Sequence, residues 1–281
     1  MRIAKVANDG RIASAIIADQ IAHIVSPWVA APHATVDFDL PRLDISQLHE
    51  LRENAREAIA LESLSLMPPV PPFAKLICLG LNYRNHVEET HNDLPENPSL
   101  FTKLPDALVG QGEDIVKPRV SDHFDYEGEI TVVIGKAGRH ISKEDALSHV
   151  FGYTIMLDGS VRDYQKHSAS TGKNFWKSGS LGPWIVTADE IPDPTHLALE
   201  TRLNGQTVQK TTADLMLYDI PTAISYISRW TPLAPGDIIA TGTPGGVGAR
   251  RSPPLWMKKD DVIEVEVSSV GILRNMVINE D

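Results

Sequence analysis

The sequence contains a single cysteine, Cys78, among 281 residues. One cysteine cannot form a disulfide within the chain, which is typical of proteins in a reducing compartment. Cys78 lies in the apolar run 76–79, and this setting predicts a buried strand residue rather than a reactive thiol. No apolar stretch approaches the roughly 20 residues that a membrane-spanning helix requires, and residues 1–6 lack the pattern of a signal peptide. These absences predict a cytoplasmic protein with no membrane partner.

Positive charge is also scarce, because 26 lysines and arginines face 37 aspartates and glutamates. The formal net charge is -11, which has the same sign as nucleic acids and anionic membrane surfaces, so neither is expected as a partner. The hydrophobic content of 42% and the charged content of 22% are ordinary for a globular chain. The length allows one large domain, or a small domain joined to a larger one.

The first part of the chain predicts a small α/β unit. Short apolar runs alternate with turn signals up to about residue 25, and Asn8-Asp9-Gly10 is a hairpin signal, so a β-meander is expected there. Residues 46–62 carry apolar side chains at helical spacing, with Ser46 as the N-cap. Four prolines between residues 68 and 72 exclude a helix and a central strand. A domain boundary is therefore predicted at this proline-rich segment.

The boundary divides the chain into a small N-terminal domain, residues 1–72, and a larger catalytic domain, residues 73–281. Strands dominate the larger part, and their spacing resembles neither a Rossmann fold nor a TIM barrel, which predicts a mixed, largely β domain. The expected elements are strands at 76–79, 129–134 and 150–157, hairpins at 197–210 and 262–278, and a helix at 221–230.

Glu127 and Glu129 form the first constellation with chemical meaning. Residues two apart on a strand point to the same face, so the two carboxylates would lie side by side. They repel each other unless a cation lies between them, and oxygen ligands suit Mg²⁺, Mn²⁺ or Ca²⁺. The alternative is a solvated edge strand. The apolar run 130–134, which follows directly, favours a core strand and hence a metal site.

Asp158 ends the predicted strand 150–157 and is well placed to be a third metal ligand. Arg162 and Gln165 lie one turn further on if the chain becomes helical there. The alternative is that Asp158 caps this turn and that Arg162 pairs with Asp163.

His86 and Glu89 lie three residues apart, so they share one face of a helical turn. A carboxylate beside an imidazole orients the ring and raises its basicity, as a general base for water requires. The alternative is a solvated turn in a charged stretch.

Two further segments can contact a ligand. Residues 241–248 are rich in glycine and threonine, which permits close backbone approach and hydroxyl contacts to a carboxylate; the alternative is a tight strand connection. Lys173 follows Gly172 and can hold a substrate carboxylate or stabilise an enolate; the alternative is a surface lysine.

The order of these segments resembles the fumarylacetoacetate hydrolase superfamily, in its acylpyruvase and 2-hydroxyhepta-2,4-diene-1,7-dioate isomerase branch. The matching motifs, from about residue 76 to 275, are G-x-N-Y-x-x-H-x-x-E at 80–89, Phe101-Thr102-Lys103, D-Y-E-x-E at 125–129, D-x-S-x-R-D-x-Q at 158–165, Gly172-Lys173, Gly182-Pro183 and T-G-T-P-x-G-V-G at 241–248.

The resemblance implies an α+β, mainly β fold, a mixed β-sandwich roll with a small N-terminal α/β domain, and a homodimer. It implies Mg²⁺ or Mn²⁺ as cofactor and an oxo acid as substrate. The residues that it implies are the metal ligands Glu127, Glu129 and Asp158, the catalytic residues His86, Glu89 and Lys173, and the substrate-binding residues Tyr83, Arg162, Gln165 and Thr243.

The sequence departs from the family pattern at two positions near the expected site. Trp176 stands near the position of a frequent aspartate, and Leu157 stands at the position of a frequent asparagine before the metal aspartate. Both are expected to reshape the pocket wall and so to affect the choice of substrate.

The pair His86 and Glu89 favours hydrolysis of a C–C bond in a 2,4-dioxo acid, because this hydrolysis requires an activated water. The products would be an oxo acid and a carboxylic acid. Such a hydrolase would serve in catabolism. Decarboxylation of a β-oxo acid and isomerisation of a 2-hydroxy-dienoate are alternatives on the same scaffold. A metal-stabilised binding module without turnover is the alternative of a different class.

Overall fold

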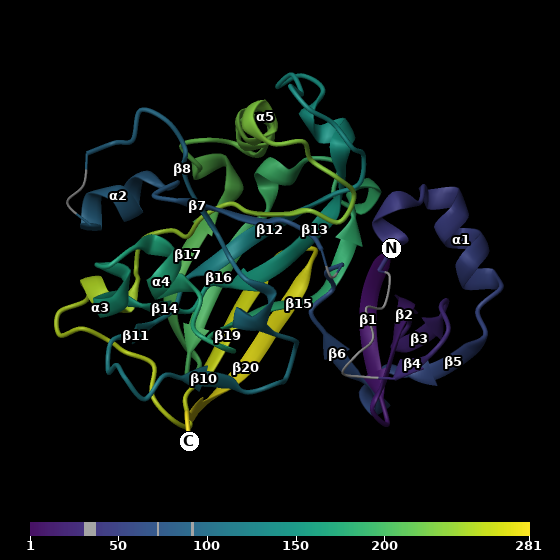
Figure 1. The fold of residues 1–281 in the computed structure, drawn as a ribbon, viewed down its shortest axis with the longest axis horizontal. Coiled ribbons are helices and arrows are strands. Elements are labelled where there is room, and N and C mark those ends of the chain that lie inside the picture. The colour runs from purple at the N-terminus through teal and green to yellow at the C-terminus, as the bar shows by residue number, and fades with distance from the viewer. Residues whose placement is uncertain (31–37, 72, 91–92) are drawn as a thin grey trace.

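The structure is a computed structural model that describes residues 1–30, 38–71, 73–90 and 93–281. Pro72, at the predicted domain boundary, lies outside the described residues. The fold is α+β and mainly β, as the sequence predicted (Figure 1). No helix in these ranges is both long enough and apolar enough to cross a membrane.

A large mixed sheet runs through the molecule, and 13 strands of the described residues belong to it. In order across the sheet they are β5 (Glu57–Ala60), β3 (Ile21–Ile24), β2 (Arg11–Ala18), β1 (Arg2–Asn8), β15 (Gly179–Thr187), β13 (Val150–Leu157), β12 (Gly128–Ile134), β18 (Ile238–Ala240), β7 (Leu76–Gly80) and β8 (Ser99–Thr102), with β4 (Val29–Ala30) beside β2, β6 (Ser65–Met67) beside β1 and β9 (Leu108–Val109) beside β15.

A second sheet packs against the first and closes the predicted roll (Figure 1). Its strands are β10 (Ile115–Lys117), β20 (Gly271–Asn279), β19 (Val262–Val267), β16 (Ala198–Leu203) and β17 (Gln206–Thr212); β11 (Phe124–Asp125) and β14 (Ser160–Val161) form a separate pair. Alternating apolar side chains of both sheets meet in one buried cluster, in which Ile130 and Ile155 of the large sheet lie with Val265 and Leu273 of the second.

Five α-helices of the described chain connect or cover the strands. They are α1 (Ile45–Glu53), α2 (Arg84–Thr90), α3 (Arg162–Gln165), α4 (Ala169–Lys173) and α5 (Ile220–Trp230). The 3-10 turns are η1 (Leu40–Arg42), η2 (Leu61–Ser63), η3 (Pro105–Ala107), η4 (Ala146–His149), η5 (Ala188–Glu190), η6 (Pro194–His196), η7 (Ala213–Leu215) and η8 (Gly248–Arg250).

The predicted N-terminal meander is present as β1, β2 and β3. Asp9 and Gly10 both have positive φ, 48° and 71°, which is the turn that a two-residue hairpin favours. Strand β1 also pairs with β15, where Ile3 lies opposite Ile185. The N-terminal strands therefore extend the large sheet, while the division into two domains stays a prediction.

The predicted helix over 46–62 is wrong in its extent and in its cap. Helix α1 begins after Asp44, whose side chain accepts a hydrogen bond from the Gln47 N–H, and not after Ser46. The helix ends at Glu53, and residues 57–60 form strand β5 on β3. The reason is that all four residues of this mostly exposed segment pair with β3. The spacing of apolar residues within the segment cannot predict pairing with a distant strand.

Candidate metal centre and active site

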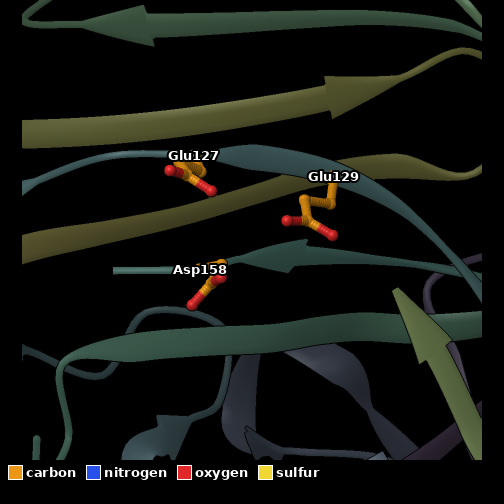
Figure 2. A group of neighbouring side chains, drawn as sticks. All are labelled: Glu127, Glu129 and Asp158. Carbon is orange, nitrogen blue, oxygen red and sulfur yellow. The ribbon is translucent and has the colours of Figure 1, made fainter. Parts of the chain in front are cut away.

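Glu127, Glu129 and Asp158 meet in the interior of the molecule. Glu127 directly precedes β12, Glu129 belongs to it, and Asp158 directly follows the neighbouring strand β13. The two strands pair antiparallel, with Gly128 opposite Leu157, and the Asp158 N–H donates to the Glu127 carbonyl over 2.8 Å. One oxygen of each carboxylate lies within 4.8 Å of the others, and all three residues are buried (Figure 2). The structure thus brings the three predicted ligands together.

Lys173 and Lys103 place positive charge beside two of these carboxylates. Lys173 Nζ lies 2.6 Å from Glu127 Oε2 and 2.7 Å from Asp158 Oδ2, and Lys103 Nζ lies 2.6 Å from Asp158 Oδ1. Both lysines are buried, so the surface alternative for Lys173 is wrong. Lys103 is a site residue that sequence reasoning missed, although it belongs to the motif Phe101-Thr102-Lys103.

Arg162 also supports the site from the start of α3. Its Nη2 lies 2.7 Å from Glu127 Oε1, its Nε donates to Asp125 Oδ2 over 2.8 Å, and its Nη1 donates to Gln165 Oε1 over 3.0 Å. Burial alone would lower the pKa of Arg162, but Asp125 and Glu127 outweigh burial and raise this pKa above its ordinary value. The alternative, in which Arg162 pairs with Asp163, is wrong, because Arg162 pairs with Asp125, a second site residue that was missed.

The two glutamates carry opposite pKa shifts. Burial would raise the pKa of Glu127, but Lys173 and Arg162 lower it to about 2. Burial raises the pKa of Glu129 well above its ordinary value, and the nearby Asp158 adds to this shift. The charge of Glu129 is therefore the one that its surroundings leave uncompensated.

The residues at this centre fit a divalent cation. Three buried carboxylates form an oxygen-only donor set, which matches Mg²⁺, Mn²⁺ or Ca²⁺. A cation would also stabilise the ionised form of Glu129, whose carboxylate receives a hydrogen bond from the Gly242 N–H at 2.9 Å. Glu127, Glu129 and Asp158 are therefore the residues that would hold the metal.

Gly242 and Thr243 close the site from the loop that follows β18. Gly242 has a φ of +93°, and a Cβ there would lie 2.9 Å from the Asn82 Cβ, so only glycine brings this N–H to Glu129 without strain. The Thr243 hydroxyl donates to the Gly128 carbonyl over 3.0 Å and accepts from Gln209 Nε2 over 2.7 Å. The predicted threonine thus anchors the loop to β12.

His86 and Glu89 form a hydrogen-bonded pair on α2. His86 Nδ1 lies 2.7 Å from Glu89 Oε1, and Glu89 Oε2 accepts from the Gly246 N–H over 2.8 Å. Because Nδ1 is held by the carboxylate, Nε2 is the ring nitrogen that remains for a substrate. His86 is only 5% exposed, which excludes the solvated turn considered above.

A cavity of about 760 Å³ joins these groups. Six of the predicted residues line it, namely His86, Glu127, Arg162, Gln165, Lys173 and Thr243. Glu129 and Asp158 are buried beside Glu127, and Glu89 is linked to the cavity through its hydrogen bond with His86. The described structure therefore unites the predicted metal ligands and acid–base pair at one site.

Two predictions about the pocket wall need correction, and a third stays open. Tyr83 is buried in the hydrophobic core and is not among the residues that line the cavity, so its contact with a substrate stays a prediction. Leu157 also points into the core, since side chains alternate along β13 and Asp158 takes the opposite face. Trp176 is 59% exposed, its ring is covered by the Lys177 ammonium, and it borders a separate groove. Neither Leu157 nor Trp176 shapes the cavity.

The fold and the arrangement of the site are those of a known class of proteins. Residues 75–278 match the protein family described as fumarylacetoacetate (FAA) hydrolase, C-terminal. The chain belongs to this family, which confirms the resemblance of its motifs.

Three similar proteins show the range of the family. The chain is 43% identical over 225 residues to oxaloacetate tautomerase YisK of Bacillus subtilis (strain 168), which covers 78% of this chain and 74% of that protein. Maleylpyruvate hydrolase from Sphingobium sp. SYK-6, solved with manganese(II) and pyruvate, has a TM-score of 0.83 and 30% identity over 100% of both chains. A 2-hydroxyhepta-2,4-diene-1,7-dioate isomerase from Mycobacterium marinum has a TM-score of 0.78 and 27% identity, over 100% of this chain and 99% of that chain.

These relatives are named as enzymes, but their names describe a tautomerase, a hydrolase and an isomerase. Family membership therefore supports an enzyme and leaves the reaction type to be argued from the site.

Proposed function

We propose that this chain is a divalent-metal-dependent enzyme that interconverts the enol and keto forms of oxaloacetate or a similar 2-oxo acid. The observation that carries the proposal is the pair of His86 and Glu89, joined over 2.7 Å, in the same cavity as Glu127 and Lys173. A proton-transfer group thus faces a site built to stabilise negative charge on oxygen. The 43% identity to a protein named oxaloacetate tautomerase supports the same reaction.

The chemistry needs only a proton transfer and stabilisation of an enolate. Bound Mg²⁺ or Mn²⁺ would supply Lewis-acid stabilisation of the charge that develops on the 2-oxo oxygen. His86 Nε2 takes a proton from C3 of the keto form and delivers it to the C2 oxygen as the enol forms; in the reverse reaction the same proton returns from the oxygen to C3 through His86. Glu89 holds the ring in place through Nδ1, and Lys173 and Arg162 offset the negative charge of Glu127 in the cavity wall. No co-reactant is consumed.

Hydrolysis of a 2,4-dioxo acid is the second candidate function. The same His86 can take a proton from water, and the cavity of about 760 Å³ has room for an acyl group beyond a pyruvate unit. A structural neighbour with 30% identity is named as a maleylpyruvate hydrolase. Both reactions share the enolate, so His86 is required in either, while the products differ.

The test follows the enol absorbance of oxaloacetate with the Mn²⁺-loaded protein and its His86→Ala variant. We expect His86→Ala to lower kcat by about 10²- to 10⁴-fold, the usual contribution of a general acid–base group, with unchanged Mn²⁺ affinity in calorimetry. His196→Ala is the matched control, because His196 also lies beside a carboxylate three residues away, 3.1 Å from Asp193, but on the surface.

Undiminished conversion by His86→Ala would remove His86 from this role. No acceleration by the wild-type protein on oxaloacetate, together with release of pyruvate from acylpyruvates, would replace the tautomerase by the hydrolase. Release of CO₂ from oxaloacetate would identify a decarboxylase instead.

A further inference from the structure

We propose that Arg250, assisted by Lys166, binds a second carboxylate at the far end of the substrate and so selects 2-oxo dicarboxylates over 2-oxo monocarboxylates. The inference deepens the proposed function, on which it rests, by naming the substrate class of the same cavity. Both cations line the cavity together with Glu127, Lys173 and His86.

The cavity has a buried end and an exposed end. Glu127, Lys173 and His86 at the catalytic end are buried, whereas Lys166 and Arg250 are exposed to solvent. A substrate whose oxo-acid end is held near Glu127 therefore extends toward Lys166 and Arg250. These two side chains lie at the solvent-exposed opening of the cavity, through which a substrate enters.

The cations at the two ends differ in their partners. At the buried end, Lys173 and Arg162 are already paired with carboxylates of the protein. At the exposed end, the side chains of Lys166 and Arg250 form no ion pair or hydrogen bond with any residue that the structure describes. In a chain with a formal net charge of -11, two cations without an acidic partner at one cavity mouth point to an anion from outside.

Asp163 shares this wall but does not neutralise the two cations. Its Oδ1 accepts a hydrogen bond from Ser121 Oγ over 2.6 Å, and its Oδ2 lies 3.7 Å from His123 Nδ1. His123 in turn packs edge-on against Trp256, with 5.0 Å between the ring centroids. Both rings line the cavity, so the wall also offers apolar surface to a short hydrocarbon chain.

Arg250 is held at a fixed position relative to the catalytic end by one buried carboxylate. Asp125 accepts from the Gly248 N–H over 2.7 Å and from the Ala249 N–H over 2.9 Å, which anchors the turn η8 that carries Arg250. The same Asp125 accepts from Arg162 Nε over 2.8 Å, and Arg162 contacts Glu127. The backbone of Arg250 and the metal-binding carboxylates therefore form one connected unit, which can measure the length of a substrate.

The experiment measures binding to the Mn²⁺-loaded protein by isothermal titration calorimetry. The ligands are pairs of unbranched 2-oxo acids of equal chain length, one with a second terminal carboxylate and one without, from four to seven carbons. At one or more lengths we expect the wild-type protein to prefer the dicarboxylate by about fivefold, the upper range for an exposed ion pair. Added salt should reduce this preference because it screens exposed charges.

Arg250→Ala should abolish most of the preference for the dicarboxylate and leave the affinity for the monocarboxylate unchanged. Lys166→Ala should reduce the preference less than Arg250→Ala does. Arg250→Lys should retain part of the preference. Arg229→Ala is the matched control, because Arg229 is an exposed arginine at the end of α5 and outside the cavity wall. It should keep the full preference.

The absence of any preference in the wild-type protein, or an equal loss of both ligands in Arg250→Ala, would overturn the inference. Failure of the proposed function would give a different result. The wild-type protein would then not catalyse enol–keto conversion, whatever its preference among the ligands. The two failures are therefore distinguishable in one set of samples.

Discussion

Glu127 and Glu129 illustrate how single residues of one type acquire different properties. They lie two positions apart, yet the pKa of Glu127 falls to about 2 while burial and the neighbouring Asp158 raise that of Glu129. The difference arises because Lys173 and Arg162 contact Glu127, whereas Glu129 receives the N–H of Gly242. Glu129 is thus the ligand for which an added cation matters most.

We expect Glu129→Gln to lower the affinity for Mn²⁺ by at least about tenfold, as changes at and around metal ligands do. The metal-free variant should be more stable than the metal-free wild-type protein, because the substitution removes a buried negative charge beside Asp158 and Glu127. Calorimetry gives the affinity, and thermal unfolding with and without Mn²⁺ gives the stability.

The matched control is Glu113→Gln. Glu113 also accepts a backbone N–H, that of Gly110 over 2.6 Å, but lies outside the carboxylate triad. Its substitution should leave Mn²⁺ binding unchanged. Wild-type metal affinity in Glu129→Gln would show that Glu129 is not a ligand.

At the scale of elements, α5 shows how one cap combines with packing. The helix buries Ile220, Ile224 and Ile227 against the core of the two sheets. Asp219 caps it: its Oδ1 accepts from the Thr222 N–H over 2.8 Å, and its Oδ2 lies 2.9 Å from Lys143 Nζ. Burial would raise the pKa of Asp219, but these contacts outweigh it and lower the pKa.

We expect Asp219→Ala to reduce the free energy of unfolding by about 1 kcal/mol at pH 7, the typical value of an N-cap, and Asp219→Asn to reduce it less. A carboxyl with a lowered folded-state pKa stabilises the protein above its unfolded pKa of about 3.9, and this contribution disappears as the pH falls through the lower folded value. The difference between wild type and Asp219→Asn should therefore begin to shrink below about pH 4 and vanish only at pH values below the lowered folded-state pKa of Asp219.

Urea unfolding at several pH values measures these differences. Lys143→Ala separates the cap from the ion pair, because it removes only a half-exposed pair of small energetic value. Equal stability of Asp219→Ala and wild type at pH 7 would contradict the role of the cap.

At the scale of the whole molecule, the N-terminal elements share a core with the rest of the chain. Ile3, Ile16 and Leu48 belong to the same buried cluster as Val133 and Ile185 of the large sheet. Strand β1 also covers the edge of β15. The large sheet and the hydrophobic core are therefore continuous across the proline-rich segment at which a domain boundary was predicted.

We expect residues 73–281, expressed without residues 1–72, to unfold roughly 10 °C or more below the full chain and to aggregate. Each fully buried Ile or Leu contributes about 1.5–3 kcal/mol, 1 kcal/mol shifts Tm by about 2–4 °C at this size, and an uncovered β15 is an open sheet edge. Thermal unfolding and size-exclusion chromatography provide the measurement, and the latter also tests the predicted homodimer.

A stable, monodisperse 73–281 fragment with full Mn²⁺ affinity would instead establish the predicted two-domain division. The full chain unfolding in two separate steps would point the same way.

Features that depend on residues a few positions apart could be predicted from the sequence alone. The alternation of a strand aligns Glu127 with Glu129, a helical turn aligns His86 with Glu89, and a strand that ends at Leu157 delivers Asp158. The hairpins at 198–212 and 262–279 follow for the same reason, since their turns and apolar alternation are local. Motif order then sufficed to identify the family.

The three-dimensional fold sets the contacts between distant parts of the chain. Lys103 reaches Asp158, Asp125 joins Arg162 to the turn of Arg250, and Gly242 reaches Glu129. It also turned Tyr83 into the core and Trp176 toward solvent. Local spacing carries no information on such contacts, because they depend on which strands pair, in which register, and on how the two sheets pack.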